Sequence, residues 1–350
     1  MSRAFIDLQS DVKSRPTAAM RRAMAEAEVG DEAAHEDPTV NALCERVAAL
    51  LGKEAALFAP SGTQCNQIAL CTLGRPGDEL ICDRTSHILC FESGGLAANA
   101  GMNATALEGD RGRFTAADLE HAVRMRSRQA PRQSVLSIEQ TSNLGGGAIW
   151  PLEQIEAVCE VARRHGMKTH MDGARLMNAV VASGVSAADY ARPFDSVWID
   201  FSKGLGAPVG AALAGSKAFI DEAWRAKQRL GGTMRQAGIV AAGALFALDH
   251  HVARLAHDHE QARRLALGLD RQPGIVIDPS WVETNLVFFS LDPERCPLDA
   301  RAFCDALLER GVRMGVYGPR LVRAVTHIDV HANDIDQALL SIEAVLADAR

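Results

Sequence analysis

Lys203 is the first residue whose surroundings suggest chemistry. It follows a short apolar run, residues 197–201, that predicts a buried strand, and it precedes a loop rich in glycine. A lysine is most often a solvated surface charge, but apolar flanks and small following residues favour burial here. A partly desolvated lysine loses its proton more easily and becomes a nucleophilic amine, the group that forms Schiff bases. We therefore predict that Lys203 is a nucleophile.

Asp172 and Arg175 stand at the end of another predicted strand, residues 167–171. Proteins of the α/β class place ligand contacts at the carboxyl ends of parallel strands. Structural carboxylates are commoner than functional ones. Asp172 and Arg175, however, lie about thirty residues before Ser202 and Lys203, which also stand at the end of a predicted strand. The spacing favours a shared ligand site.

Ser61, Gly62 and Thr63 form the turn between a predicted strand, residues 55–59, and a helical pattern that becomes clear from residue 66. A helix N-terminus offers free backbone N–H groups and the positive end of the helix dipole to an anion. The three residues are candidate phosphate ligands, although Ser-Gly-Thr is also an ordinary helix cap.

His87 follows the predicted strand at residues 79–82. A histidine at such an edge is commonly a satisfied polar residue, and it is also a ring that can pack flat on a planar ligand.

Four chemical functions can thus be assembled: an amine at Lys203, an anion cradle at Gly62 and Thr63, a planar group at His87 and an acid at Asp172. Pyridoxal 5'-phosphate (PLP) needs all four. Its aldehyde forms an imine with lysine, its phosphate binds a helix N-terminus, and its ring nitrogen needs a carboxylate so that the protonated ring accepts electrons.

Alternating strands and helices must position these residues. The expected strands are residues 55–59, 79–82, 105–107, 135–138, 167–171, 197–201 and 211–213, followed by 275–277, 285–290 and 322–326. The alternation from residue 55 to 215 predicts a mainly parallel sheet. A long helical stretch, residues 238–269, could bridge to a second unit. We expect a large domain over residues 15–247, a smaller C-terminal α/β domain over 248–350 and an N-terminal arm over 1–14.

Composition excludes several classes of function. The chain has 350 residues, 47% hydrophobic and 23% charged, with a formal net charge of -7, so we expect no nucleic-acid partner. The longest apolar candidate for membrane insertion, residues 239–248, is about half the length needed to span a bilayer. Eight cysteines without a C-x-x-C pair, and an N-terminus without a signal-peptide pattern, favour a reduced cytoplasm.

Several motifs resemble one enzyme family in order and over nearly the whole chain. They are Asp7-Leu-Gln-Ser-Asp11, Asp37-Pro-Thr-Val-Asn41, Ser61-Gly-Thr63, Phe91-Glu-Ser-Gly-Gly95, His170-Met-Asp-Gly-Ala-Arg175, Ser202-Lys-Gly-Leu-Gly-Ala-Pro-Val-Gly210, Met234-Arg-Gln236 and Val322-Arg-Ala-Val-Thr-His327. Together they resemble the low-specificity L-threonine aldolases. The resemblance implies the aspartate-aminotransferase-like fold (fold type I), in which a large domain with a seven-stranded, mainly parallel sheet holds PLP. It also implies active sites shared between the subunits of a dimer, usually paired into a homotetramer.

Carried over residue by residue, the resemblance implies a role for each cofactor contact. Lys203 would form the imine, Asp172 would partner the pyridine nitrogen, and His87 would stack on the ring. Ser61, Gly62 and Thr63, with Ser202, would hold the phosphate, and Arg175 would contact the phenolic oxygen. Arg235 would reach the phosphate in the neighbouring subunit.

The resemblance also implies substrate contacts. Ser10 and Arg323 would bind the amino acid's carboxylate, with Arg175 nearby. Ser142 would contact the substrate near its hydroxyl group, and Glu92 would order a catalytic water. No metal is expected. The implied reaction is retro-aldol cleavage of L-threonine, L-allo-threonine or a related β-hydroxy-α-amino acid to glycine and an aldehyde.

Two positions depart from the family's pattern. The family commonly has histidine where this chain has Ser142, and serine by itself is a poor general base. The proton route would then pass through His87 and water. A tyrosine usual before the Asp-Pro-Thr motif is Ala34 here, with His35 next to it. Both changes concern the end of the site that receives the β-substituent.

Three other interpretations remain open at this level. Another PLP reaction is one, either β-elimination or cleavage of a bulkier substrate such as phenylserine or 3-hydroxyaspartate. A PLP-binding protein without turnover is the second. A dinucleotide-binding oxidoreductase is the third, but the spacing from Gly204 and Gly206 to Gly210 does not fit the dinucleotide fingerprint.

Overall fold

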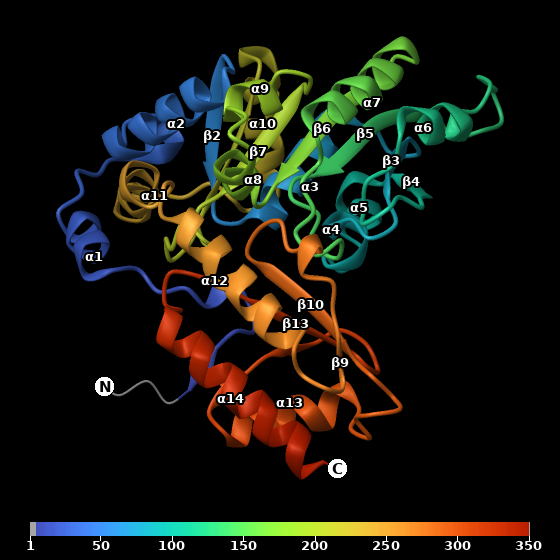
Figure 1. Ribbon diagram of the computed structural model, residues 1–350. Coiled ribbons are helices and arrows are strands. Elements are labelled where there is room, and N and C mark those ends of the chain that lie inside the picture. The colour runs from blue at the N-terminus through green and yellow to red at the C-terminus, as the bar shows by residue number, and fades with distance from the viewer. Residues whose placement is uncertain (1–4, 350) are drawn as a thin grey trace.

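A seven-stranded sheet forms the centre of the larger of two units in the computed structural model, which describes residues 5–349 (Figure 1). The strand order is β2-β8-β7-β6-β5-β3-β4. Every neighbouring pair from β7 to β4 is parallel, whereas β8 runs antiparallel to both β7 and β2. The prediction of a mainly parallel seven-stranded sheet is therefore confirmed. The strands are β2 (Ala55–Ala59), β3 (Glu79–Asp83), β4 (Asn103–Leu107), β5 (Gln133–Glu139), β6 (Lys168–Gly173), β7 (Ser196–Asp200) and β8 (Ala211–Gly215).

Helices cover both faces of this sheet. The helices of the larger unit are α1 (Ala18–Ala25), α2 (Pro38–Leu51), α3 (Gly62–Leu73), α4 (His87–Cys90), α5 (Gly95–Ala100), α6 (Ala116–Ala122), α7 (Leu152–Arg164), α8 (Leu176–Ser183), α9 (Ala187–Ala191), α10 (Lys217–Arg229) and α11 (Gly238–His250). Residues of α2, α7, α9 and α11 share the largest apolar core, and α3 packs with α10 in a separate core. The central strands are buried almost throughout, and they carry buried polar residues such as Thr169 and His170 on β6 as well as apolar ones.

The smaller unit is a four-stranded antiparallel sheet with helices against it and its own apolar core. Its elements are α12 (Leu255–Leu269), β9 (Ile275–Val276), β10 (Leu286–Leu291), α13 (Ala300–Glu309), β11 (Val312–Arg313), β12 (Gly315–Val316), β13 (Leu321–Val325) and α14 (Ala332–Asp348). Three short 3₁₀ turns, Asp11–Lys13, Glu32–Ala34 and Pro279–Trp281, complete the elements.

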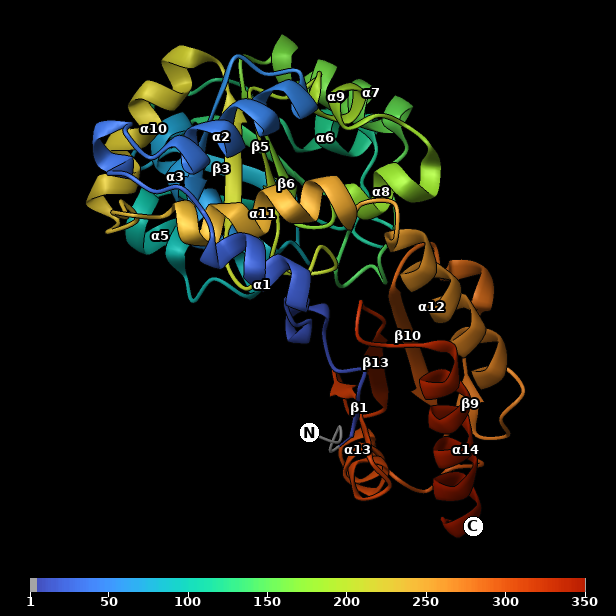
Figure 2. The same ribbon diagram turned by 90° about the vertical axis from the view of Figure 1, so that its left-hand side faces the viewer.

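The N-terminal segment links the two units (Figure 2). Its strand β1 (Ile6–Asp7) pairs in parallel with β11 of the smaller unit, and the chain then continues to α1 against the larger one. The hydroxyl of Ser14 donates to the carbonyl of Lys203 at 2.7 Å, so the segment crosses the edge of the large sheet. Residues 1–4 of the predicted arm lie outside the described residues, as does residue 350. The domain limits near residues 14 and 247 stay a prediction.

The helical stretch expected over residues 238–269 is two helices. The helix α11 ends at His250, α12 begins at Leu255, and their axes differ by 72°. The break directs the chain from the larger unit to the smaller one (Figure 2). Among residues 5–349, no single helix is long and apolar enough to cross a bilayer, and only this bent pair reaches the required length and composition together.

Candidate active site

Polar side chains converge where the central strands of the large sheet end. Glu139 ends β5, Asp172 lies near the end of β6, and Asp200 ends β7. Glu139 and Asp172 are register partners in the sheet, so their side chains start side by side. His87 begins α4, four residues after β3. The sheet edge therefore brings together residues that are far apart in the sequence, as the parallel-strand pattern predicts.

Asp172 is buried and is held by a neutral donor. Its Oδ2 accepts a hydrogen bond from Nδ2 of Asn66 at 2.8 Å, and its Oδ1 accepts one from the backbone N–H of Ala174 at 3.1 Å. Burial raises the pKa of Asp172, and the positive charges of His87 and Lys203, with the Asn66 hydrogen bond, oppose that rise. Such a carboxylate gains strongly from a cationic partner, and a protonated pyridine nitrogen is one.

His87 is joined to Glu92. Its Nδ1 lies 2.9 Å from Oε1 of Glu92, and its backbone N–H donates to Oε2 of Glu139 at 2.9 Å. Burial alone would lower the pKa of His87, but the bond to Glu92 and the charges of Asp172 and Glu139 raise it overall. The side chain of His87 is 30% exposed, and the ring centroid of Phe91 lies 5.5 Å from that of the imidazole, so part of the ring is accessible to a planar ligand.

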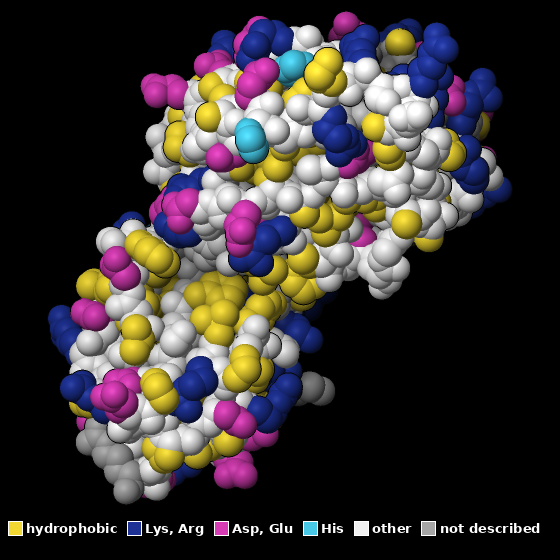
Figure 3. Space-filling view, turned by 90° about the vertical axis from the view of Figure 1, so that its right-hand side faces the viewer, with side chains coloured by type: hydrophobic (Ala, Val, Ile, Leu, Met, Phe, Trp, Pro, Cys, Tyr) yellow, Lys and Arg dark blue, Asp and Glu magenta, His cyan; other side chains and the backbone are white. Residues whose placement is uncertain are grey.

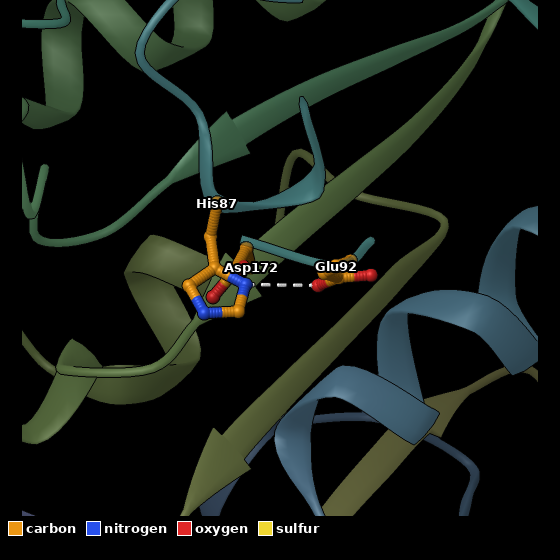
Figure 4. A group of neighbouring side chains, drawn as sticks. All are labelled: His87, Glu92 and Asp172. Carbon is orange, nitrogen blue, oxygen red and sulfur yellow. Dashed lines mark hydrogen bonds and ion pairs between the residues drawn. The ribbon is translucent and has the colours of Figure 1, made fainter. Parts of the chain in front are cut away.

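His87, Glu92 and Asp172 form one compact group (Figure 4). Each offers one nitrogen or oxygen atom, and these atoms lie within 4.8 Å of one another, a spacing that would also suit a metal ion. The expectation that the site needs no metal stays a prediction.

Lys203 stands three residues beyond the end of β7 and is mostly buried. Its Nζ forms an ion pair with Oδ2 of Asp200 at 2.7 Å and lies 5.6 Å from the centroid of the Trp198 ring. Its side chain is 17% exposed, so the expected partial burial is observed. Asp200, which the sequence interpretation did not select, also accepts from the backbone N–H and the hydroxyl of Ser202.

The predicted phosphate cradle is a genuine helix N-terminus. The hydroxyl of Ser61 caps α3 by accepting from the N–H of Gln64 at 3.2 Å. Gly62 must lack a side chain, because a Cβ atom there would lie 2.2 Å from the Trp198 ring. The N–H groups of Gly62 and Thr63 belong to the first turn of a 12-residue helix and have no intrahelical acceptor. These features fit a phosphate group. The Ser202 hydroxyl, by contrast, is bonded to Asp200.

Arg175 forms a buried, bidentate ion pair with Asp11. Its Nε and Nη2 donate to the two oxygens of Asp11, each at 2.7 Å. Nδ2 of Asn285 donates to the same carboxylate at 3.1 Å. Burial would raise the pKa of Asp11, but Arg175 and Lys203, with these hydrogen bonds, hold that pKa well below its usual range. The contacts predicted for Arg175 with a cofactor oxygen and with substrate stay a prediction.

Arg323, on β13, faces the large sheet from the smaller unit. Its Nη1 donates to Oδ1 of Asn143 at 2.8 Å, its Nη2 donates to the carbonyl of Gln9 at 3.2 Å, and it stacks 4.2 Å from the Tyr317 ring centroid. Its Nε is buried and has no hydrogen-bond partner among the described residues. Burial and the nearby charge of Arg175 lower the pKa of Arg323. A guanidinium with an unpaired donor, and with neutral hydrogen-bond partners at its other nitrogens, is equipped to receive an anionic group.

The two serines predicted to bind substrate make local hydrogen bonds. Ser10 accepts from the N–H of Val12 at 3.4 Å and caps a 3₁₀ turn. Ser142 is buried, accepts from the N–H of Gly145 at 3.2 Å, and lies so close to Gly112 that a Cβ atom there would be 2.1 Å from its hydroxyl. Ser142 therefore packs between two loops.

Arg235 is not brought to this group. Its side chain is 72% exposed and forms its ion pair with Asp31 at 3.6 Å. The contact predicted with a neighbouring subunit's cofactor stays a prediction. Ala34 lies in the nearby 3₁₀ turn, and the ring of His35 packs edge-on against Trp224 at 5.1 Å.

An apolar pocket of about 210 Å³ lies beside the Arg323 region, where the two units meet. Leu144, Trp281 and Phe288 are among its lining residues, and Phe288 is the cross-strand partner of Arg323. Figure 3 shows hydrophobic side chains gathered in the hollow between the units on one face of the molecule.

Five residues with a structural part in this site were given no role from the sequence: Asp11, Asn66, Glu139, Asn143 and Asp200. Asp11 ends the Asp7–Asp11 motif, and Glu139 directly follows the predicted strand at residues 135–138, so the position of each was a usable signal. Asn143 lies in the loop after the same strand, and Asp200 lies inside the predicted strand at residues 197–201. Asn66 lies inside α3 and carries no such signal, because only the fold brings it to Asp172.

The chain is similar to known proteins over nearly its whole length. The family model described as beta-eliminating lyase matches residues 7–292. Low-specificity L-threonine aldolase 1 of Arabidopsis thaliana is 38% identical over 340 residues, which cover 95% of this chain and 94% of that protein. A threonine aldolase structure from Leishmania major has a TM-score of 0.84 at 21% identity, covering 97% of this chain and 99% of that one. A structure of SPT with a PLP internal aldimine has a TM-score of 0.73 at 18% identity, covering 99% and 88%.

Proposed function

The chain belongs to the low-specificity L-threonine aldolase family within the beta-eliminating lyases, and we propose that it cleaves L-threonine, L-allo-threonine or a related β-hydroxy-α-amino acid to glycine and an aldehyde. The observation that carries this proposal is the meeting of Lys203, Asp172 and His87 at one sheet edge, with Arg323 nearby from the smaller unit. The cofactor is PLP, which when bound supplies a carbonyl that condenses with amines and a ring that accepts electrons.

Different residues of the chain would hold different parts of the cofactor. Lys203 would anchor its carbonyl carbon, Asp172 would stabilise positive charge on its ring nitrogen, and the first turn of α3 would receive its phosphate. Support comes from the burial of Asp172 and from the position of Gly62 and Thr63 in the first turn of α3, where their backbone N–H groups have no intrahelical acceptor. His87 would cover one face of the ring.

Substrate binding would rest on Arg323, with Ser10 and Arg175 close by. A carboxylate held by a guanidinium fixes how the substrate's bonds are oriented, and that orientation decides which bond breaks. The hydroxyl proton would pass to His87, directly or through water ordered by Glu92. Support for this route is the 2.9 Å contact between Nδ1 of His87 and Oε1 of Glu92. The hydroxyl of Ser142 is instead bonded to the N–H of Gly145.

Assembly and location complete the proposal. We infer a cytoplasmic homotetramer, a dimer of dimers in which Arg235 reaches the phosphate site of the neighbouring subunit. The exposure of Arg235 supports this role: its side chain is 72% exposed, so a second chain can contact it beside its ion pair with Asp31.

The direct test is glycine formation by the purified, PLP-loaded protein from L-threonine, L-allo-threonine and phenylserine. The proposal predicts glycine from at least one of the three. 2-Oxobutyrate from either threonine isomer, or phenylpyruvate from phenylserine, in place of glycine would indicate a β-eliminating lyase, and bound cofactor without product would indicate a PLP-binding protein.

A second candidate is an aldolase for a bulkier substrate of the phenylserine or 3-hydroxyaspartate type. The apolar pocket lined by Leu144, Trp281 and Phe288 favours the aromatic case, because it begins next to Asn143, the partner of Arg323. A kcat/KM for phenylserine well above that for threonine would support it, and the reverse order would favour the smaller substrates.

A further inference from the structure

The side-chain amide of Asn66 lies at the centre of the site and has no part in the function proposed above. It is fully buried on the first helical turns of α3. Its Nδ2 donates to Oε1 of Glu92 at 2.7 Å and to Oδ2 of Asp172 at 2.8 Å. Its Oδ1 accepts from Nε1 of Trp198 at 2.6 Å and faces Nε2 of His170 at 3.0 Å. One amide thus makes four hydrogen bonds, which is its full complement.

The orientation of this amide is set by its neighbours. The indole N–H of Trp198 can only donate, so the oxygen of Asn66 must face it. His170 is neutral, because burial lowers its pKa to about 3. Its Nδ1 lies 2.8 Å from the hydroxyl of Ser196, which can donate to it, and its Nε2–H then points to Asn66. Both N–H groups of Asn66 are consequently directed at carboxylates.

Those two carboxylates are close together and buried. Oxygens of Glu92 and Asp172 lie within 4.8 Å of each other, and like charges at such a separation oppose ionisation of both groups. Asn66 gives each a hydrogen bond without adding charge. Oε1 of Glu92 accepts from Asn66 and also contacts Nδ1 of His87, so the amide links the proposed ring-nitrogen partner to the proposed proton-transfer group.

Other ionisable groups also act on Asp172 from the elements around it. They are His87 on α4, Glu92 after α4, Glu139 on β5, Lys203 after β7 and Cys65 on α3. Only His87 and Lys203 are cationic, and both belong to the proposed chemistry. Asn66 is therefore the neutral donor that can stabilise both carboxylates throughout turnover.

We propose that Asn66 is a positioning residue of this site: its amide holds Asp172 and Glu92 as neighbouring anions and couples the PLP ring-nitrogen site to the His87–Glu92 pair. The inference rests on the proposed function, since it assumes that PLP occupies the site. In this role, the Asn66 amide would keep Asp172 ionised, so that Asp172 can pair with a protonated ring nitrogen.

The substitution Asn66→Asp tests this directly. It preserves size and keeps oxygens for Trp198 and His170, but it replaces the donor group by an acceptor and adds a third anion to the cluster. The matched control is Ser196→Ala, which removes a hydrogen bond from the same network at His170 without touching a carboxylate.

Two measurements separate positioning from simple structural support. One is the Kd for PLP, from titration of apoprotein by visible absorbance. The other is the 15N resonance of ring-labelled PLP, which reports protonation of the ring nitrogen. We expect N66D to weaken PLP binding by about tenfold or more, the equivalent of one unit in the pKa of its partner, and to shift the ring resonance. S196A should leave both unchanged.

The double variant N66D/E92Q supplies a second test, including the case in which N66D folds poorly. It moves the amide to position 92 and returns the number of buried carboxylates to that of the wild type. We expect it to recover most of the PLP affinity that N66D loses and to bind within a few-fold of the wild type.

The inference is overturned if folded N66D binds PLP with wild-type affinity and an unchanged ring resonance, or if N66D/E92Q binds more than tenfold more weakly than the wild type. Glycine formation by the wild type is scored separately. If the wild type forms glycine but N66D binds PLP normally, the proposed function is supported and the role of Asn66 is not. If the wild type forms no glycine but N66D binds PLP more weakly, the role of Asn66 is supported and the aldolase activity is not.

Discussion

The cofactor side and the substrate side of the site are built from different parts of the molecule. On the cofactor side, Asp172, Glu139 and Asp200 come from adjacent strands of one sheet, and Asn66 and His87 come from helices that follow strands of the same sheet. On the substrate side, Arg323 reaches in from the smaller unit, and its partners Asn143 and Gln9 lie on loops. The first side is fixed by backbone register. The second depends on how two units and an N-terminal segment meet.

This difference predicts that the substrate side is the more adaptable. On the cofactor side, the sequence resembles the family at each expected position, whereas the two departures from the family's pattern, Ser142 and Ala34, are expected at the end that receives the β-substituent. A change in substrate preference can therefore arise without disturbing the contacts around Asp172 and Lys203. The following experiments test that contrast.

The Asp11–Arg175 ion pair joins the N-terminal segment to the large sheet, so its loss should have the largest effect on stability. We expect Asp11→Asn to lower the free energy of unfolding at pH 7 by about 3 kcal/mol, because it leaves a buried guanidinium without its counter-ion. The folded-state pKa of Asp11 is lowered, so its contribution is complete above the unfolded pKa of about 4 and decreases progressively as the pH falls from there toward the lower folded-state pKa. Urea unfolding at pH 7 and at about pH 3 would measure this.

The control is Asp7→Asn, which affects a partly exposed ion pair with Arg313 on the same segment. It should cost about 1 kcal/mol or less. A D11N cost that is equally small, or independent of pH, would contradict the role assigned to the buried pair.

Arg323 should affect substrate binding and leave the cofactor alone. We expect Arg323→Lys to raise KM for the amino acid by about ten- to a hundredfold, since a charge-assisted pair contributes roughly 1.5–3 kcal/mol. The Kd for PLP should stay within about twofold of the wild type. Steady-state glycine assays and PLP titration give the two values. If Arg323→Lys weakened substrate binding and PLP binding by similar factors, the cofactor side and the substrate side of the site would not be separable.

Ser142 tests how tightly the loops of the substrate side are packed. We expect Ser142→His to destabilise the protein by about 1–3 kcal/mol, because the larger ring must displace the loops at Gly112 and Gly145. Ser142→Ala, the control, removes only the hydrogen bond from Gly145 and should cost about 1 kcal/mol. Thermal unfolding would measure both. A fully stable S142H with faster glycine formation would mean that the position can accept a base without repacking.

Glu92 should set the protonation of His87. Because the bond to Glu92 helps to raise the pKa of His87, we expect Glu92→Gln to lower that pKa. NMR titration of the imidazole in the apoprotein would detect the shift. His165, which contacts Glu120 on the surface, gives an internal reference that should not move. An unchanged His87 titration would remove the basis for treating the two residues as a pair.

The same contrast explains what the sequence could predict. Lys203 was found because it follows a short apolar run, and Asp172 because it stands at the end of a predicted strand, and both features can be seen in the sequence alone. Strands such as β2 were predicted with their observed limits for the same reason. Asn66 was not found, because the sequence around it does not show whether its side-chain amide contacts a carboxylate or packs in an apolar core.

Boundaries that depend on tertiary packing were harder to predict. The stretch from residue 238 to 269 has helix-forming residues throughout, yet the chain turns by 72° between His250 and Leu255. The pairing of β1 with β11 was not predicted either, since each strand has only two residues and the partners are about 300 residues apart. Such contacts are decided by the meeting of the two units.

The central claim is that Lys203 is the amine that binds PLP. Its most direct test is borohydride reduction of the PLP-loaded protein followed by peptide mapping with mass spectrometry. We predict one pyridoxyl group, located on Lys203, and loss of the reducible visible band in Lys203→Ala. A pyridoxyl group on another lysine, such as the buried Lys227, or a reducible band that persists in K203A would contradict the claim.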